Sequence, residues 1–200
     1  MVIFVHVLLC ARKASRGYGG ISITYYYMSE SIHPTVDKIE SLLRENGFWY
    51  ERFLHEPVRT SEEAAAVRTG YLQKQGTKSL IVKVKDATGT GPNKRFVMLV
   101  VPGDKQFDKK KVKSELGFTD VRFANEDEVS QITGGILPGG VPPFGNLFEL
   151  PVYVDVSVFE NEKVIFNAGD RRVSIGMLSA DYRALIAPIV HSFVLETDSL

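Results

Sequence analysis

The sequence predicts an α+β domain in which helices pack against a mixed or antiparallel sheet. Segments with apolar residues at helical spacing are interspersed with short β-branched segments typical of strands. The 200 residues carry 24 Lys and Arg against 24 Asp and Glu, and 44% of them are apolar. Such a chain can bury a core, which argues against a disordered protein or a polycationic nucleic-acid binder. We expect one domain over residues 31–200.

Residues 1–30 are expected to form an N-terminal extension, with the fold beginning near Ser31. The apolar run from Val2 to Ala11 is shorter than the roughly 20 residues that a membrane span needs. No basic residue precedes this run, as one would in a signal peptide. With no export signal and a single cysteine, Cys10, the cytoplasm is the expected compartment and no membrane partner is expected.

Start and stop signals define the expected helices. Pro34 suits the first turn of a helix that Gly47 ends. The run from Thr60 to Glu63 is a capping signal, Asn125 precedes three acidic residues, and Ser179 is a further candidate cap. The helices are therefore expected at residues 34–46, 62–69, 108–116, 125–132 and 179–187.

Short segments rich in apolar and β-branched residues define the expected strands. They lie at residues 48–54, 78–86, 95–101, 121–124, 152–159, 163–167 and 172–177. The segment from Thr88 to Asn93 is expected to be a hairpin connection. The segment from Thr133 to Asn146 contains five glycines and three prolines, so it is expected to be an irregular loop.

Strand periodicity singles out Lys78 among the lysines. It shares a face with Leu80 and Val82, whereas Lys83 and Lys85 lie on the opposite face, which is expected to be solvated. An ammonium on the apolar side at the start of a strand could look into a cleft. The alternative is that Lys78 extends past the sheet edge into water.

The glycine-proline loop is the second candidate feature. Gly139 and Gly140 can adopt conformations closed to other residues, and Pro143 stiffens the chain that follows. Such a loop can direct backbone N–H groups at a carbonyl or phosphate oxygen. It can equally be a simple connection.

The remaining candidates are weaker. Asp155 lies in a very apolar strand, where a carboxylate needs a partner, and it either bonds the backbone or faces a site. His55 is more often a packed histidine than a base. No GxSxG motif, metal-ligand cluster or thiol nucleophile is found in the main body of the sequence. No metal or cofactor is expected.

Three ordered motifs resemble a known family. They are His55-Glu56-Pro57-Val58 with the following Thr60–Ala65, then Gly76–Leu80, then Gly139–Gly145. Together they resemble the YbaK / prolyl-tRNA synthetase editing-domain superfamily over about residues 33–195. The resemblance implies an α+β domain around a mixed, barrel-like sheet. It also implies hydrolysis of mischarged aminoacyl-tRNA, typically proline tRNA carrying alanine or cysteine, with the tRNA 3′ end and possibly a synthetase as partners.

The resemblance also assigns roles to residues. Lys78 would contact the terminal adenosine or the ester region, and the loop would position the aminoacyl carbonyl and water. Some related domains carry an alanine-selecting histidine near the hairpin 167–170, where this chain has Asp170 and Arg171, which argues against alanine specificity. The implied catalytic residues are Lys78, Gly139, Gly140 and Pro143, and the implied substrate-binding residues are His55, Ser79, Asp155, Gly169 and Asp170.

Three functions remain open on the sequence. The first is a trans-acting aminoacyl-tRNA deacylase, in which water attacks the ester, backbone N–H groups of Gly139 and Gly140 stabilise the oxyanion, and a ribose hydroxyl assists. The second is a non-catalytic module of the same fold that binds tRNA or a synthetase. The third is a hydrolase of an unrelated small ester. The amino acid removed, the tRNA and the oligomeric state do not follow from the sequence.

Overall fold

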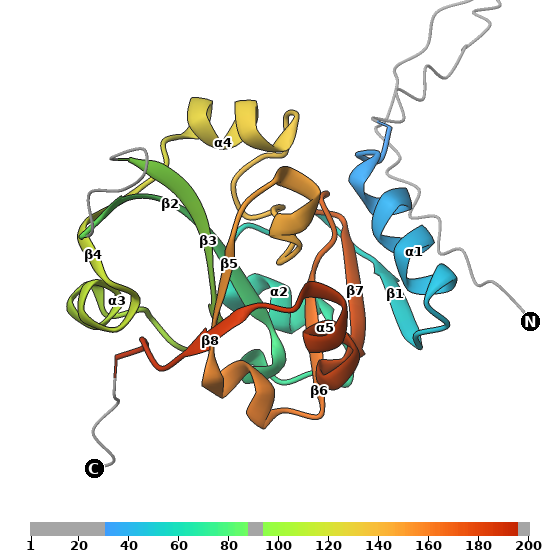
Figure 1. Ribbon diagram of the computed structural model, residues 1–200. Coiled ribbons are helices and arrows are strands. Elements are labelled where there is room, and N and C mark those ends of the chain that lie inside the picture. Colours follow the sequence, from blue (N-terminus) through green and yellow to red (C-terminus); the bar gives the residue numbers. More distant parts are fainter. Residues whose placement is uncertain (1–30, 88–93, 196–200) are drawn as a thin grey trace, which may run out of the picture. The chain divides into compact units, whose positions relative to one another are not determined.

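The most apolar strand of the chain lies in the middle of a five-stranded mixed sheet. The computed structural model describes residues 31–87 and 94–195. In that sheet β3 (Arg95–Pro102) pairs antiparallel with β2 (Thr77–Asp86) and parallel with β5 (Val152–Asp155). The strand order is β4-β2-β3-β5-β8, with β4 (Phe118–Phe123) and β8 (Ile189–His191) at the edges (Figure 1).

A second, three-stranded sheet is entirely antiparallel. It consists of β1 (Tyr50–Leu54), β7 (Val173–Leu178) and β6 (Lys163–Asn167), in the order β1-β7-β6. The α+β class with a mixed sheet is thus confirmed. The strands form two separate sheets and do not close into a barrel.

Both faces of the five-stranded sheet are buried, which explains the continuous apolar run of β3. Met98 and Val100 belong to the larger core, which lies between the two sheets and also contains Phe144 and Phe166. The alternate residues of β3 belong to a second core under α3 (Lys109–Leu116), where they meet residues such as Val112 and Phe118. Ile81 likewise faces the larger core, so the face of β2 that carries Lys83 is buried in part, contrary to the expectation.

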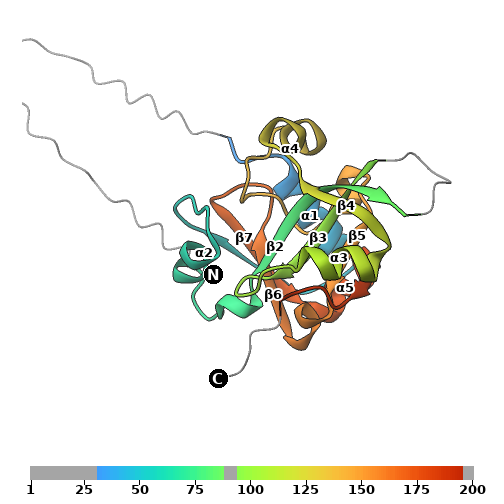
Figure 2. The same ribbon diagram turned by 90° about the vertical axis from the view of Figure 1, so that its left-hand side faces the viewer.

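The other helices flank the sheets. They are α1 (Thr35–Glu45), α2 (Ser61–Val67), α4 (Glu126–Thr133) and α5 (Ser179–Ile186), with 3-10 turns η1 (Gln73–Gln75), η2 (Gly145–Phe148) and η3 (Val156–Glu160). Figures 1 and 2 show α2 and α3 on different sides of β2. The capping boxes of α2 and α4 are confirmed. Ser179, however, is the first residue of α5 and does not cap it.

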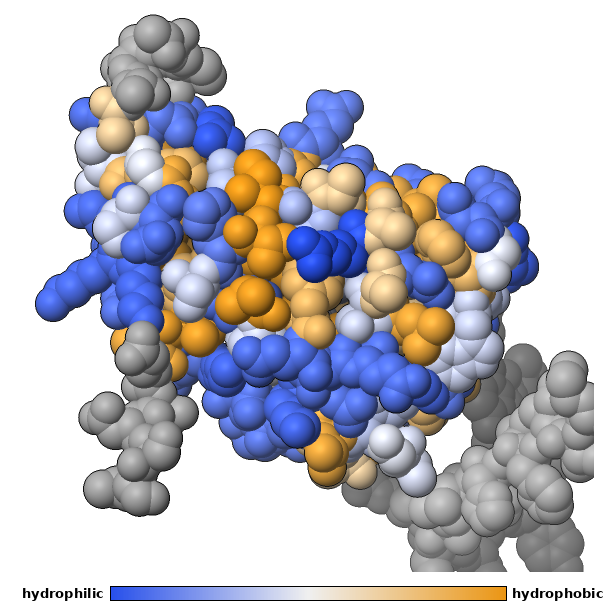
Figure 3. All heavy atoms as spheres, turned by 60° about the horizontal axis from the view of Figure 1, so that its bottom comes forward, coloured by the Kyte–Doolittle hydropathy of each residue, from blue (hydrophilic) through white to orange (hydrophobic). Residues whose placement is uncertain are grey.

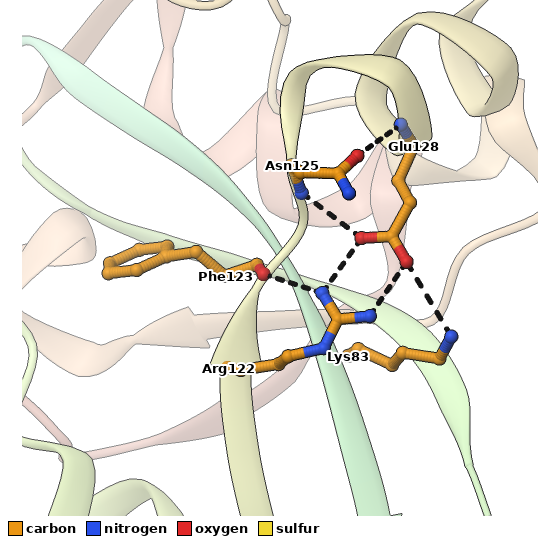
Figure 4. Close-up of polar contacts among 5 residues, drawn as sticks. All are labelled: Lys83, Arg122, Phe123, Asn125 and Glu128. Atoms are coloured by element: carbon orange, nitrogen blue, oxygen red, sulfur yellow. Dashed lines mark hydrogen bonds and ion pairs between the residues drawn. The ribbon is translucent and has the colours of Figure 1, made fainter.

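An exposed polar cluster fastens α4 to the five-stranded sheet. We call Lys83, Arg122, Asn125 and Glu128 the Glu128 cluster (Figure 4). Arg122 forms a bidentate pair with Glu128, with N···O distances of 2.8 and 2.7 Å, and Lys83 Nζ lies 3.5 Å from the same carboxylate. The Glu128 carboxylate also accepts from the Asn125 N–H, and these contacts lower the pKa of Glu128 to about 2, with Arg122 as the main cause.

One expected strand is too long, and one strand of the structure was not expected. The strand expected at 152–159 ends at Asp155, because the chain turns there into η3 with the Asp155 side chain accepting from Ser157 N. Strand β8 was not predicted, since it has only three residues. The expected N-terminal extension and the hairpin at 88–93 lie outside the described residues, so both stay predictions.

The surface near the lower edge of Figure 1 is mixed in character. Figure 3 shows apolar side chains there interrupted and bordered by hydrophilic ones. Among the exposed apolar residues of the chain are Val156 and Ile189, each 46% exposed. No helix within residues 31–87 and 94–195 is long and apolar enough to cross a membrane.

Candidate active site

The first half of β2 leaves one sheet edge unpaired, and a cavity lies against it. β4 pairs with β2 only from Val82 onward, and the last bond toward that side joins Ala124 N–H to Ile81 O at 2.9 Å. Beside the unpaired residues is a cavity of about 370 Å³, a volume within the usual range for small-ligand sites. Its lining comes from α2, η1, β2, β6 and the glycine-proline loop: Arg59–Glu62, Ala64, Ala65, Arg68, Tyr71–Gln73, Gly76–Leu80, Gly139, Ile165 and Asn167.

Lys78 lines this cavity from β2. Its half-buried ammonium donates to the carbonyl of Lys105, in the loop after β3. Burial lowers the pKa of Lys78, and the nearby carboxylates of Glu62 and Asp104 oppose that shift. An ammonium has three N–H donors, so the bond to Lys105 leaves donors for a ligand.

Two hydroxyls on the same strand are unsatisfied. The Oγ1 of Thr77 and the Oγ of Ser79 are buried and have no hydrogen-bond partner among the described residues. Both residues line the cavity. A buried hydroxyl without a partner costs about 1–3 kcal/mol, so these two groups lower the stability of this part of β2. Ser79 was among the predicted substrate-binding residues, and Thr77 was not.

The glycine-proline loop reaches the same cavity at Gly139. Gly139 has φ +88°, and a Cβ at this position would lie 3.1 Å from the Arg59 carbonyl oxygen. Both the backbone conformation and the close contact therefore disfavour a side chain here. The loop carbonyls are bonded to the β6–β7 hairpin: Arg171 donates to Pro138 O, Asn167 to Gly139 O at 2.6 Å, and Gly169 N–H to Gly140 O at 2.9 Å. The loop is therefore rigidly held before any ligand arrives. The Gly139 N–H has no acceptor among the described residues.

Gly140 is a correction to the expectation. Its N–H donates to Leu137 O at 2.9 Å within the loop, so it is not free to bind an oxyanion. Pro143 also lies outside the cavity lining, and its carbonyl accepts from the buried Tyr182 hydroxyl at 2.8 Å. Gly169 supports the loop through its N–H and packs against Thr35. Of the loop residues, only Gly139 lines the cavity.

Arg68, at the end of α2, is a cavity residue that the sequence analysis missed. Its side chain is buried and donates from Nε to Ser174 Oγ at 3.0 Å and from NH2 to Asn167 Oδ1 at 2.9 Å. Helical spacing could have found it, because Arg68 follows the buried Ala64 by four residues and so shares its face. We call His55, Arg68, Asn167 and Ser174 the Arg68 cluster.

His55 lies behind the cavity in this cluster and does not line it. Its Nε2 is 2.8 Å from Ser174 Oγ and its Nδ1 is 2.8 Å from Glu56 O. Burial is the main cause that lowers the pKa of His55, and the Arg68 charge adds to it. In the neutral ring Nδ1–H donates to the Glu56 carbonyl, so Nε2 accepts the Ser174 hydroxyl proton.

Two predicted carboxylates also lie outside the cavity lining. The buried Asp155 accepts from the N–H groups of Ser157, Phe193 and Val194 and from the Ser157 hydroxyl, so it fastens β5 to the C-terminal segment. Asp170 pairs with Arg172 within the hairpin at 2.7 Å, a contact that lowers the pKa of Asp170 to about 2. The described residues contain no group of three or more His, Cys, Asp or Glu placed to hold a metal ion.

The fold is thus an α+β domain, and its candidate site is a cavity at the open edge of the mixed sheet with a lysine and a rigid glycine loop. The chain belongs to the aminoacyl-tRNA editing domain family, whose model matches residues 55–185. That match spans all the elements that line the cavity.

Similar proteins include proline–tRNA ligases and an uncharacterized protein. The chain is 30% identical over 126 residues to a proline–tRNA ligase of Trichlorobacter lovleyi, which covers 62% of this chain and 20% of that protein. It is 33% identical over 91 residues to the uncharacterized protein YwhH of Bacillus subtilis, covering 46% of this chain and 57% of that protein. The chain thus spans only a fifth of the ligase's length.

Solved structures share the fold over their full length. A crystal structure of a candidate trans-editing enzyme for prolyl-tRNA synthetase has a TM-score of 0.67 and 25% identity, covering 83% of this chain and 100% of that one. The crystal structure of the hypothetical protein APE2540 has a TM-score of 0.67 and 26% identity, covering 79% and 99%.

Proposed function

We propose that this chain is a trans-acting deacylase that hydrolyses the ester of mischarged aminoacyl-tRNA, with proline tRNA carrying cysteine, alanine or a similar small amino acid as the candidate substrate. The observation that carries the proposal is that Lys78 and Gly139 line one cavity although they are distant in the sequence. The cytoplasm, where aminoacyl-tRNA is used, is the proposed compartment.

In this mechanism the protein supplies no nucleophile. Water attacks the ester carbonyl, assisted by a ribose hydroxyl of the terminal adenosine, and the Gly139 N–H donates to the developing oxyanion. The Lys78 ammonium holds the 3′ end by charge, at the stretch of β2 that lines the cavity. A well-placed donor to an oxyanion is worth about 3 kcal/mol, so the rigid Gly139 loop is a favourable place for it.

The test is deacylation of proline tRNA charged with cysteine, alanine, serine or proline by the wild-type chain, Lys78→Ala and Lys85→Ala. Lys85 is an exposed lysine on the same strand and is the matched control. We expect Lys78→Ala to lower kcat/KM about 10²-fold, as for a misplaced substrate, and Lys85→Ala to have no effect. Full activity in Lys78→Ala would remove this residue from the mechanism.

The same panel separates the alternatives. Binding of tRNA without turnover of any charged tRNA would favour a non-catalytic module of this fold. Hydrolysis of simple esters that an excess of non-hydrolysable alanyl- or cysteinyl-adenosine does not inhibit would favour an unrelated esterase.

A further inference from the structure

Arg68 presents unused hydrogen-bond donors to the cavity. A guanidinium carries five N–H groups, and here Nε and one N–H of NH2 are bonded, to Ser174 and Asn167. The third nitrogen, NH1, lies beside Gly76, where a Cβ would be 3.4 Å from it. NH1 has no acceptor among residues 31–87 and 94–195, and both Arg68 and Gly76 line the cavity.

No carboxylate in the described part of the chain pairs with the charge of Arg68. Burial lowers the pKa of Arg68 to about 10, so the group remains a cation at neutral pH, and no carboxylate among the described residues offsets that shift. Only 5% of the residue is exposed, and its acceptors are a neutral hydroxyl and a neutral amide. A buried cation held only by neutral groups is costly unless an anion or a strong acceptor completes it.

The proposed mechanism expected two backbone donors to the oxyanion, and one of them is not available. Two backbone donors were expected, from Gly139 and Gly140, and the Gly140 N–H is bonded to Leu137 O. Arg68 and Gly139 contact opposite ends of the same amide, since Asn167 accepts from Arg68 through Oδ1 and donates to Gly139 O through Nδ2. Asn167 thereby links the guanidinium to the residue that carries the expected backbone donor, and all three residues line the cavity.

We infer that Arg68 is a catalytic residue that binds the ester carbonyl oxygen and stabilises its negative charge. The inference rests on the proposed deacylase function. Water oxygen bonds to the carbonyl carbon, and the π pair moves to the carbonyl oxygen, which accepts from Arg68 and Gly139 N–H. Collapse of this intermediate breaks the bond to the ribose oxygen, which takes a proton from the attacking water. The products are the free amino acid and the 3′-terminal hydroxyl of tRNA.

His55 and Ser174 act as positioning residues for this guanidinium. The Nε2 of neutral His55 accepts a hydrogen bond from the Ser174 hydroxyl, so the lone pairs of Ser174 Oγ are left to accept from Arg68 Nε. Two charged groups act on the pKa of His55 in opposite directions, since Arg68 lowers it and Asp170 raises it.

The kinetic test compares Arg68→Gln, Arg68→Lys and Arg122→Gln with the wild-type chain. Arg122 is an arginine of the Glu128 cluster, outside the cavity lining, and it controls for the loss of a guanidinium. We expect Arg68→Gln to lower kcat about 10²–10³-fold with KM nearly unchanged, as for loss of an oxyanion donor. Arg68→Lys should fall in between, and Arg122→Gln should match the wild type. A change confined to KM, or unchanged kcat in Arg68→Gln, would overturn the inference.

A binding test needs no turnover, and its first comparison uses the wild-type chain alone. The probes are the 3′-adenosine ester of 1-aminoethylphosphonic acid, which is tetrahedral and anionic, and 3′-alanylamino-3′-deoxyadenosine, which keeps a neutral planar carbonyl. We expect the wild-type chain to bind the phosphonate at least about tenfold more tightly, and Arg68→Gln to lose this preference. Equal affinities in the wild type overturn the inference about Arg68, whereas absent deacylation with a retained preference overturns only the proposed function.

Discussion

The Arg68 cluster and the Glu128 cluster balance charge in different ways. In the Glu128 cluster one carboxylate accepts from Arg122, Lys83 and a backbone N–H, so every charge has an opposite partner (Figure 4). In the Arg68 cluster a buried cation is held by a hydroxyl and an amide, both neutral. The first cluster is complete without a ligand, and the second is not.

Location agrees with this difference. The Glu128 cluster joins β4 and α4 to the part of β2 that is paired on both sides, and it is largely exposed. The Arg68 cluster adjoins the part of β2 that has one open edge, where buried hydroxyls also lack partners. A buried cation without a carboxylate partner, an unpaired strand edge and two hydroxyls without an acceptor or donor, all judged among the described residues, therefore lie around one cavity. Unsatisfied groups gathered at one place are typical of binding sites, where function requires groups that lower the stability of the free protein.

Among three further predictions, Gly139→Ala is expected to have the largest effect on catalysis. The substitution puts a Cβ 3.1 Å from the Arg59 carbonyl at φ +88°, so the loop must shift. We expect kcat/KM for deacylation to fall about 10²-fold, as for a catalytic group displaced by about 1 Å. Thermal unfolding should show a loss of about 1–2 kcal/mol from the left-handed backbone, plus the cost of the close contact.

Gly134→Ala is the matched control for this prediction. Gly134 ends α4 with φ +73°, and a Cβ there would meet nothing within 4 Å. It should lose a similar conformational energy and keep full activity. If both variants lose activity equally, the role of the Gly139 loop in the mechanism is wrong.

The second prediction compares the substitution of one asparagine by alanine in each cluster. Asn167→Ala leaves a buried Arg68 N–H and the Gly139 carbonyl without their partners, at about 1–3 kcal/mol for each group. Asn125→Ala removes the helix cap of α4, at about 1 kcal/mol. We expect Asn167→Ala to be the less stable variant in denaturant unfolding and the only one with a lower kcat.

Equal kcat values for the two variants would show that the Arg68 cluster, like the Glu128 cluster, has only a structural role. Equal kcat values for Asn167→Ala and Asn125→Ala, measured where both variants are fully folded, would mean that Asn167 only joins β6 to its neighbours. Arg68 would then have no link to the reacting ester.

Local signals in the sequence were sufficient for the caps of α2 and α4 and for part of the site. The capping patterns at Thr60 and Asn125 depend on residues three apart, so they predict α2 and α4 directly. Strand periodicity singled out Lys78 and backbone freedom singled out Gly139. The resemblance to editing domains joined these two, and the cavity contains both.

The Arg68 cluster was not predictable, because its members come from separate elements. Arg68 follows α2, Asn167 ends β6 and Ser174 lies in β7; the pairing of β6 with β7 sets Asn167 opposite Ser174, and Arg68 bonds to both. The loss of the Gly140 donor was equally hidden, since it depends on a tight turn to Leu137 that the composition of the loop does not specify. Asp155 shows the converse, a buried carboxylate whose partners lie in a C-terminal segment nearly forty residues away.

The smallest expected effect is on how stability depends on pH, and it differs between the clusters. Because burial lowers the pKa of His55 below its usual 6.5, the unfolded chain takes up that proton first. The His55 contribution to stability is therefore complete above pH 6.5 and declines as the pH falls below it. Glu128, with its pKa lowered from 4.5 to about 2, contributes fully above pH 4.5 and loses this contribution between pH 4.5 and 2.

Melting temperatures of the wild type, His55→Gln and Glu128→Gln from pH 8 to pH 3 separate the two windows. His55→Gln should be flatter than the wild type just below pH 6.5, and Glu128→Gln should be flatter only below pH 4.5. The histidine window also bears on the site, because protonated His55 must donate through Nε2 and so return the Ser174 hydroxyl proton toward Asn167 Oδ1, 3.1 Å away. If His55→Gln follows the wild-type curve throughout, His55 is not held neutral against Ser174 and cannot position Arg68 through it.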